Sequence, residues 1–147
     1  MKLLIVDAFT NRLFAGNPAA VCLLEQERDA KWMQDVAAEM NLSETVFVLK
    51  PDADNENSVL RRLRIFTPAR EIPFAGHPIV GTWNALAREG GVPPPADGNG
   101  WQRIHHEVGI GVLPVDIEFK DGAPVQVVMT QGEFKIISEV DDAHEQA

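Results

Sequence analysis

The chain has 147 residues, which is the size of one domain, and a formal net charge of −9 from 13 basic and 22 acidic side chains. This acidic balance argues against nucleic acid as a partner, because a phosphate backbone would be repelled. No apolar run approaches the roughly 18 residues of a membrane span, so no membrane association is expected. The single cysteine, Cys22, cannot form an internal disulfide, and Asp7 interrupts the first apolar run, which favours a strand over a signal peptide. We therefore expect a cytoplasmic protein.

Strand patterns dominate the first half of the chain. Residues 3–9 and 19–24 are rich in apolar and β-branched residues, and Asn, Gly and Pro mark the connection between them. A helix is predicted after Asp29, a plausible N-cap, because apolar residues then recur on one helical face as far as Met40. Next come a predicted strand at 45–49, a polar acidic loop at 51–58 and a strand at 61–67.

The second half of the chain is predicted to contain one helix and three strands. The helix is expected to begin at Pro78, because a missing N–H costs nothing at the first helical position. A Gly/Pro-rich connection at 90–100 leads to strand-like runs at 102–108, 112–119 and 125–131. The predicted fold class is α+β, with mainly antiparallel strands around one principal helix. Residues 133–147 are acidic and lose periodicity, so a frayed tail is expected.

Three further patterns favour structural interpretations. The basic group Arg61, Arg62 and Arg64 is expected to form the wet face and end of a strand. His105 and His106 lie in a strand pattern and should point to opposite faces, so they cannot bind one metal ion together, and no metal site is predicted. The GIG at 109–111 lacks the third glycine of a dinucleotide fingerprint, which argues against that cofactor.

The segment EIPFAGHPIVGTW, residues 71–83, places Gly76, His77 and Pro78 at the start of the second helix. Gly76 is expected to supply backbone freedom at the turn. Unpaired N–H groups and the helix dipole make such a terminus an anion site, which a substrate carboxylate would fit. A neutral imidazole beside the positive helix end is suited to handling a proton. The alternative is that His77 only caps the helix.

The segment EMNLSETVFV, residues 39–48, places Glu44 between the first helix and a strongly apolar strand. A carboxylate at such a junction would be partly desolvated, which suits a general acid or base. The alternative is that Ser43 and Glu44 are ordinary turn residues.

Three long motifs, in this order and spacing, resemble the N-terminal half of the PhzF family of phenazine-biosynthesis-like isomerases. They are DAFTNRLFAGNPAAV, MQDVAAEMNLSETVFVL and RIFTPAREIPFAGHPIVGT, and they span residues 7–82. The strands up to about residue 131 look like the rest of the same lobe, which gives expected lobe boundaries of 1–132. The resemblance implies a diaminopimelate epimerase-like fold, in which each of two pseudo-symmetric lobes rolls an antiparallel sheet around a central helix. The substrate would then lie between the two helix N-termini.

The resemblance also implies roles for individual residues. Glu44 matches the family's catalytic glutamate and His77 its cleft histidine, which implies cofactor-independent isomerisation of a small carboxylic or amino-acid-like acid by proton shuttling. Residues expected to bind substrate or shape the site are Asn17, Ser43, Gly76, His77 and Pro78. Nothing in residues 84–147 resembles the family's second lobe, with its aspartate and serine. The alternative function is therefore a non-catalytic, truncated or split lobe that binds small anions or a partner chain, and a homodimer or a second-lobe partner is possible.

Overall fold

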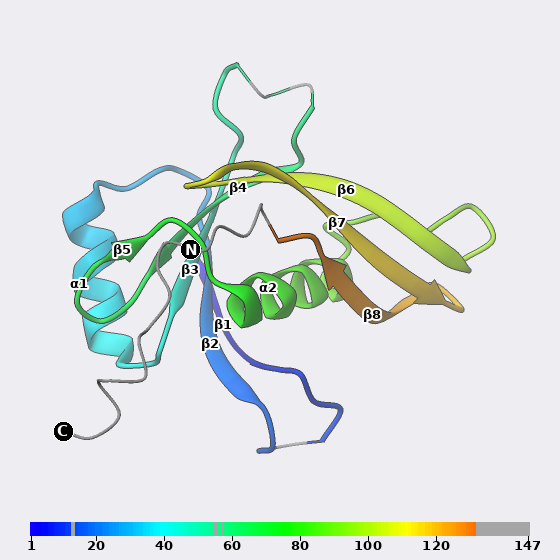
Figure 1. The fold of residues 1–147 in the computed structure, drawn as a ribbon, viewed down its shortest axis with the longest axis horizontal. Coiled ribbons are helices and arrows are strands. Elements are labelled where there is room, and N and C mark those ends of the chain that lie inside the picture. The colour runs from blue at the N-terminus through cyan, green and yellow to red at the C-terminus, as the bar shows by residue number, and fades with distance from the viewer. Residues whose placement is uncertain (13, 55, 57, 132–147) are drawn as a thin grey trace, which may run out of the picture.

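The computed structural model describes residues 1–12, 14–54, 56 and 58–131, so the expectation for residues 133–147 lies outside the described part. Figure 1 shows a curled sheet with helices packed against it. The elements are β1 (Lys2–Ala8), β2 (Asn17–Leu23), α1 (Ala30–Met40), β3 (Thr45–Leu49), β4 (Arg61–Phe66), β5 (Glu71–Ile72), α2 (Gly76–Arg88), β6 (Gly100–Val108), β7 (Gly111–Lys120) and β8 (Ala123–Met129).

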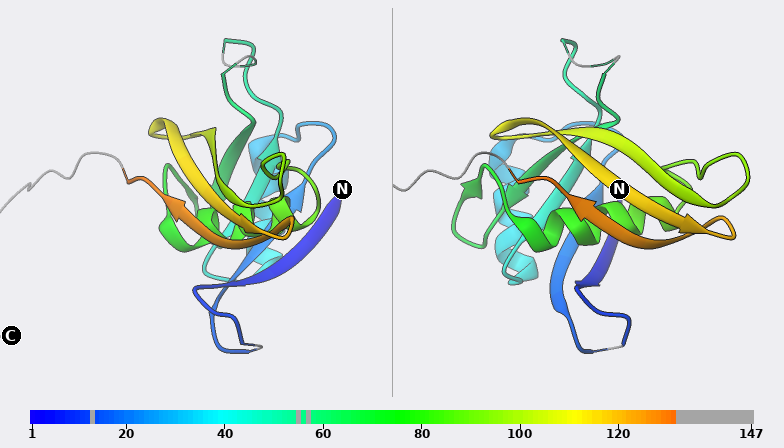
Figure 2. Two further views of the ribbon diagram at one scale, coloured as in Figure 1. Left: turned by 90° about the vertical axis from the view of Figure 1, so that its right-hand side faces the viewer. Right: turned by 45° about the vertical axis from the view of Figure 1, so that its right-hand side comes forward.

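The strands form one mixed sheet in the order β1-β2-β3-β4-β6-β7-β8, with β5 added beside β4. The β2–β3 and β4–β6 pairs are parallel and the other pairs are antiparallel. Helix α2 contacts β1 and β2 near one end of the sheet and β8 at the other, so the sheet curls around this helix (Figures 1 and 2). The predicted α+β class, with mainly antiparallel strands around one principal helix, is confirmed.

The two faces of the sheet carry separate cores. On the inner face, Ile79 and Trp83 of α2 pack among strand residues that include Val46, Val48 and Leu63. On the outer face, α1 covers a smaller cluster that contains Met33, Phe47 and Cys22. Side chains alternate between the faces of a strand, which is why neighbouring residues of β3 enter different cores. Burial raises the pKa of the Cys22 thiol to about 11, as expected for a cysteine that packs as a small hydrophobe.

Helix α1 starts at the predicted cap, whereas helix α2 starts earlier than predicted. Asp29 is the N-cap of α1, as predicted, and its side chain accepts a hydrogen bond of 2.8 Å from the backbone N–H of Trp32. Helix α2 begins at Gly76 and not at Pro78. Pro78 is therefore its third residue, where the missing N–H still belongs to the first turn and breaks no helical hydrogen bond. Gly76 has no positive φ, so the expectation that it supplies backbone freedom is wrong.

Strand β5 was not anticipated from the sequence. It has only two residues, too few for a period-2 pattern, and it exists because Ile65 and Phe66 of β4 pair with Ile72 and Glu71. Among the described residues no helix is long and apolar enough to cross a membrane. His105 is exposed and His106 buried, which confirms their opposite orientations, and the described part of the chain holds no group of three or more potential metal ligands.

Candidate active site

The two candidate catalytic side chains meet at one end of the sheet. Glu44 immediately precedes β3, and strand alternation gives it the same inner face as Val46 and Val48, which pack against α2. His77 is the second residue of α2. Nε2 of His77 lies 3.2 Å from Oε2 of Glu44, and their side chains are only 11% and 17% exposed. Residues 33 positions apart in the sequence are therefore brought into contact.

The contact leaves hydrogen-bonding capacity on both groups. Although Nε2 of His77 and Oε2 of Glu44 are within ion-pair distance, they are not aligned for a hydrogen bond, and both atoms are buried without another partner among the described residues. Buried polar atoms are normally paired, and an unpaired one costs about 1–3 kcal/mol. A third group that bonded to either atom would remove this cost. The pair is thus arranged to receive a polar or proton-bearing ligand atom.

The backbone around His77 favours an anion. The N-cap of α2 is Ala75, which has extended φ and ψ and provides no side-chain hydrogen bond to the first turn. The first turn of a helix has unpaired N–H groups, and the helix dipole adds partial positive charge there. An anion could therefore bind beside a potential proton carrier, as the sequence led us to expect. The occupancy of this position stays a prediction.

The other candidate residues surround this end of the sheet. Asn17 is the first residue of β2, exposed, and on the inner face by alternation with Ala19 and Val21. The neighbouring strand is held close, because the Ala20 N–H donates to the Glu44 carbonyl at 3.1 Å. Ser43 is exposed, Gly76 is half-buried and Pro78 is buried in α2. Among the described residues no hydrogen bond joins Asn17 or Ser43 to the pair, so their roles stay predictions.

One residue at this site had no sequence signal. Met129 ends β8, and its ε-methyl lies 3.5 Å from the position that a Cβ would occupy on Gly76. Met129 follows Gly76 by 53 positions, and only the β7–β8 register, which pairs it with Val115, brings it onto the inner face. Its position depends on tertiary pairing, which a linear pattern does not reveal.

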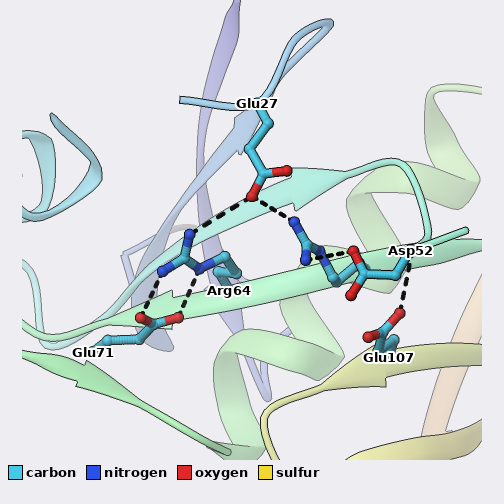
Figure 3. Close-up of polar contacts among 6 residues, drawn as sticks. Glu27, Asp52, Arg64, Glu71 and Glu107 are labelled. Carbon is cyan, nitrogen blue, oxygen red and sulfur yellow. Dashed lines mark hydrogen bonds and ion pairs between the residues drawn. The ribbon is translucent and has the colours of Figure 1, made fainter. Parts of the chain in front are cut away.

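A second charged group lies on the outer face and has a different character (Figure 3). Arg64 binds Glu71 through two hydrogen bonds of 2.8 and 2.7 Å, which raises the pKa of its guanidinium, and Arg62 pairs with Glu27 and Asp52. A cavity of about 470 Å³ lies beside these residues. The side chains of Arg62 and Arg64 are only 18% and 22% exposed, so this face of the strand is less accessible to solvent than predicted. Its arginines already have carboxylate partners, which makes the group structural.

Comparison with known proteins decides the family. The profile of the family described as "Phenazine biosynthesis-like protein" (PhzC-PhzF) matches residues 6–145. The chain belongs to this family. Among curated relatives, trans-2,3-dihydro-3-hydroxyanthranilate isomerase of Pseudomonas aeruginosa is 38% identical over 130 residues, which are 88% of this chain and 42% of that protein. A human phenazine biosynthesis-like domain-containing protein is 53% identical over 79 residues, covering 52% of this chain and 27% of its own length.

Solved structures support the same assignment. A PhzF-family protein of Bacillus anthracis is 33% identical, with a TM-score of 0.66 over 80% of this chain and 36% of the other. A hydroxyproline epimerase of Agrobacterium vitis has a TM-score of 0.67 at 14% identity, covering 87% and 40% of the two chains, and it shows the fold alone. The fold is thus the epimerase-like one of the PhzF family. The chain spans about two-fifths of the length of the curated isomerases that it matches.

Proposed function

We propose that this PhzF-family chain contributes to a cofactor-independent isomerase that moves a proton within a small carboxylic or amino-acid-like acid. The observation that carries the proposal is the contact between Glu44 and His77 beside the N-terminus of α2, with both side chains largely buried. This arrangement combines a binding position for an anion with two groups that can accept or donate a proton. The substrate carboxylate would bind at the first turn of α2.

The chemistry assigned to each group follows from its position. Glu44 takes a proton from a carbon of the bound acid, and a proton is then returned at another carbon or on the other face of the same one. Nε2 of His77 lies 3.2 Å from the Glu44 carboxylate, and we propose that His77 accepts or donates the proton that Glu44 handles. The N–H groups and dipole of α2 stabilise negative charge that develops on the substrate carboxylate during proton removal.

The relatives support the reaction class. The Pseudomonas aeruginosa relative is named as an isomerase of trans-2,3-dihydro-3-hydroxyanthranilate, a cyclic amino acid, which makes this compound the first substrate to test. We propose an acid of this kind as the substrate of the present chain.

A second candidate is a lobe that binds small anions or a partner chain without turnover. It is favoured by the length comparison, since the curated isomerases are more than twice as long as the matched region. Such a lobe would keep the α2 anion position, while residues from another lobe or another copy would be needed for the reaction. The two functions differ in whether a carbon-bound proton is exchanged.

The discriminating experiment is deuterium exchange. The purified chain is incubated in D₂O with trans-2,3-dihydro-3-hydroxyanthranilate, and incorporation of deuterium at carbon is followed by proton NMR. The wild type is expected to catalyse exchange, and Glu44→Gln is expected to abolish it while the melting temperature stays nearly unchanged, since the substitution is almost isosteric. Glu39→Gln is the matched control, because Glu39 is an exposed carboxylate of α1.

Three outcomes would change the interpretation. Full exchange by Glu44→Gln would remove Glu44 from the mechanism. A Glu44→Gln protein that does not fold would assign Glu44 a structural role. Binding of the acid by the wild type without any exchange would favour the anion-binding lobe.

A further inference from the structure

A cavity of about 340 Å³ lies at the other end of α2 from the Glu44–His77 pair. It forms where β2 and β3 end and where β1 and β4 begin, and Leu86 of α2 contributes to its wall. Leu86 follows His77 by nine positions in the same helix, which places it about 13 Å further along the helix axis. The cavity is therefore separate from the candidate active site.

This cavity is basic although the chain carries a net charge of −9. Lys2, Lys50 and Arg61 line it, and Glu25 is the one acidic residue among its lining side chains. Lys2 pairs with Glu89, whereas neither Lys50 nor Arg61 has a carboxylate partner among the described residues. The local excess of positive charge favours an anionic ligand.

Arg61 has an unused hydrogen-bonding edge. Nη1 of its half-buried side chain donates a hydrogen bond of 2.8 Å to the Leu60 carbonyl. Arg64 and Arg103 use the other edge of the guanidinium, formed by Nε and Nη2, to bind an acidic side chain through two hydrogen bonds. Within the described part of the chain, this edge of Arg61 binds nothing. A ligand carboxylate there would complete an arrangement that two other arginines already have.

The rest of the cavity wall is aliphatic. It is formed by leucine and valine side chains of β2, β3 and α2 and of the residue that follows β2: Leu23, Leu24, Val48, Leu49 and Leu86. Val48, Leu49 and Leu86 are buried, and Leu23 and Leu24 are half-buried. An aliphatic chain that packed against this wall would lose apolar surface to water, which stabilises binding.

We infer that this cavity is a second binding site, which takes a small aliphatic carboxylic acid. The carboxylate binds the Nε–Nη2 edge of Arg61, and the carbon chain lies along Leu24 and Leu86. Lys50 adds positive charge at the rim. The last turn of α2 carries partial negative charge, so side-chain cations and not the helix dipole hold the anion. The inference goes beyond the proposed function, because neither Glu44 nor His77 lines this cavity.

NMR titration with three probes tests both parts of the site. Hexanoate has the carboxylate and the aliphatic chain, acetate lacks the chain, and hexylammonium reverses the charge. Hexanoate is expected to shift the side-chain Nε–H signal of Arg61 and the methyl signals of Leu24 and Leu86 in a saturable way. Acetate is expected to bind at least tenfold more weakly, because it has almost no apolar surface to bury. Hexylammonium is expected to leave the Arg61 signal unchanged.

Arginine variants test the carboxylate contact. Arg61→Gln removes the charge and the planar edge, so hexanoate affinity is expected to fall at least tenfold. Arg61→Lys keeps the charge without the edge and is expected to lose at least fivefold. Arg103→Gln is the matched control, because Asp116 already occupies that edge of another strand arginine, and its hexanoate affinity should stay within twofold of the wild type. If Arg61→Gln does not fold, Arg61→Lys gives the same test.

The remaining outcomes separate this site from the candidate active site. Hexanoate shifts confined to the backbone N–H signals of Gly76 and His77 would overturn the inference. Equal affinity for acetate and hexanoate, or unchanged hexanoate affinity in both Arg61 variants, would overturn it too. Glu44→Gln is expected to bind hexanoate at Arg61 as the wild type does, so the second site stands or falls independently of deuterium exchange.

Discussion

His106 makes the stability of this fold depend on pH. Its ring lies in the inner core, 1% exposed and 5.8 Å from the ring of Trp83, and neither ring nitrogen has a hydrogen-bond partner among the described residues. Burial, together with a smaller effect of the neighbouring His105, lowers the pKa of His106 from its ordinary 6.5 to about 4. Across the β4–β6 pair its register partner is Arg61, a second cationic residue that does not favour a charged imidazole. Protonation of His106 is therefore far easier in the unfolded chain.

The size of the effect follows from this pKa difference. Between about pH 6.5 and pH 4 the unfolded chain holds a proton on His106 that the folded chain does not, so the free energy of unfolding falls as the pH falls through this window. A difference of about 2.5 pKa units corresponds to a loss of about 3 kcal/mol at pH 4 relative to pH 7. Above pH 6.5 both states have a neutral imidazole, and this contribution to the pH dependence vanishes.

Urea unfolding followed by tryptophan fluorescence at several pH values between 7 and 4 measures this loss. His106→Leu removes the titrating ring from the core, and it is expected to be at least as stable as the wild type at pH 5 and to lose about 3 kcal/mol less on acidification. His105→Leu is the control, because the side chain of His105 is exposed at the adjacent position. Both variants keep all the carboxylates of the wild type, so effects of acid on those groups are shared. If the two variants lose stability in parallel with the wild type, the proposed cause is wrong.

Two other expectations can be checked with the same protein. The Cys22 thiol is fully buried and its pKa is about 11, so it should react with a thiol reagent at pH 8 only in denaturant; rapid labelling of the folded chain would contradict the packing. We also propose that the chain pairs with a second copy as a homodimer, because Leu3 and Ile5 of the edge strand β1 are 42% and 55% exposed. Light scattering at micromolar concentration should give twice the chain mass, Ile5→Lys should restore the single mass, and a wild-type mass of 16.2 kDa would exclude stable pairing.

The sequence was sufficient for the parts of the fold that depend on local periodicity. The strand at 45–49 has bounds identical to those of β3, and Asp29 caps α1 as predicted. Local chemistry decides these features, since apolar alternation and a capping side chain act within a few residues. The predicted start of α2 at Pro78 is wrong, because the helix begins at Gly76, and glycine and proline are compatible with several positions in a first turn.

The sequence was insufficient where distant segments meet. Glu44 and His77 were both candidates, but their 3.2 Å contact depends on the inner-face orientation of Glu44 and on α2 lying inside the curl of the sheet. The partners of Arg62 come from two loops, and no pattern in the motif RRLR predicts Glu27 or Asp52. Met129 is a comparable case, because only the pairing of β8 with β7 places it beside Gly76.

The Arg62–Arg64 group and the Glu44–His77 pair differ in how their charges are matched, and this difference supports the choice of site. In the first group both guanidinium groups bind carboxylates, although Nε of Arg62 is buried without a hydrogen bond among the described residues. On the outer face, Arg64 shares two hydrogen bonds with Glu71, so the charges neutralise each other and mainly hold β4 to β5. On the inner face, the Glu44 and His77 atoms that face each other are buried without a hydrogen bond. Folding alone gives no benefit from such an arrangement, because an aligned pair or two apolar residues would be more stable there. A bound acid that supplies the missing hydrogen bonds would account for the Glu44–His77 arrangement.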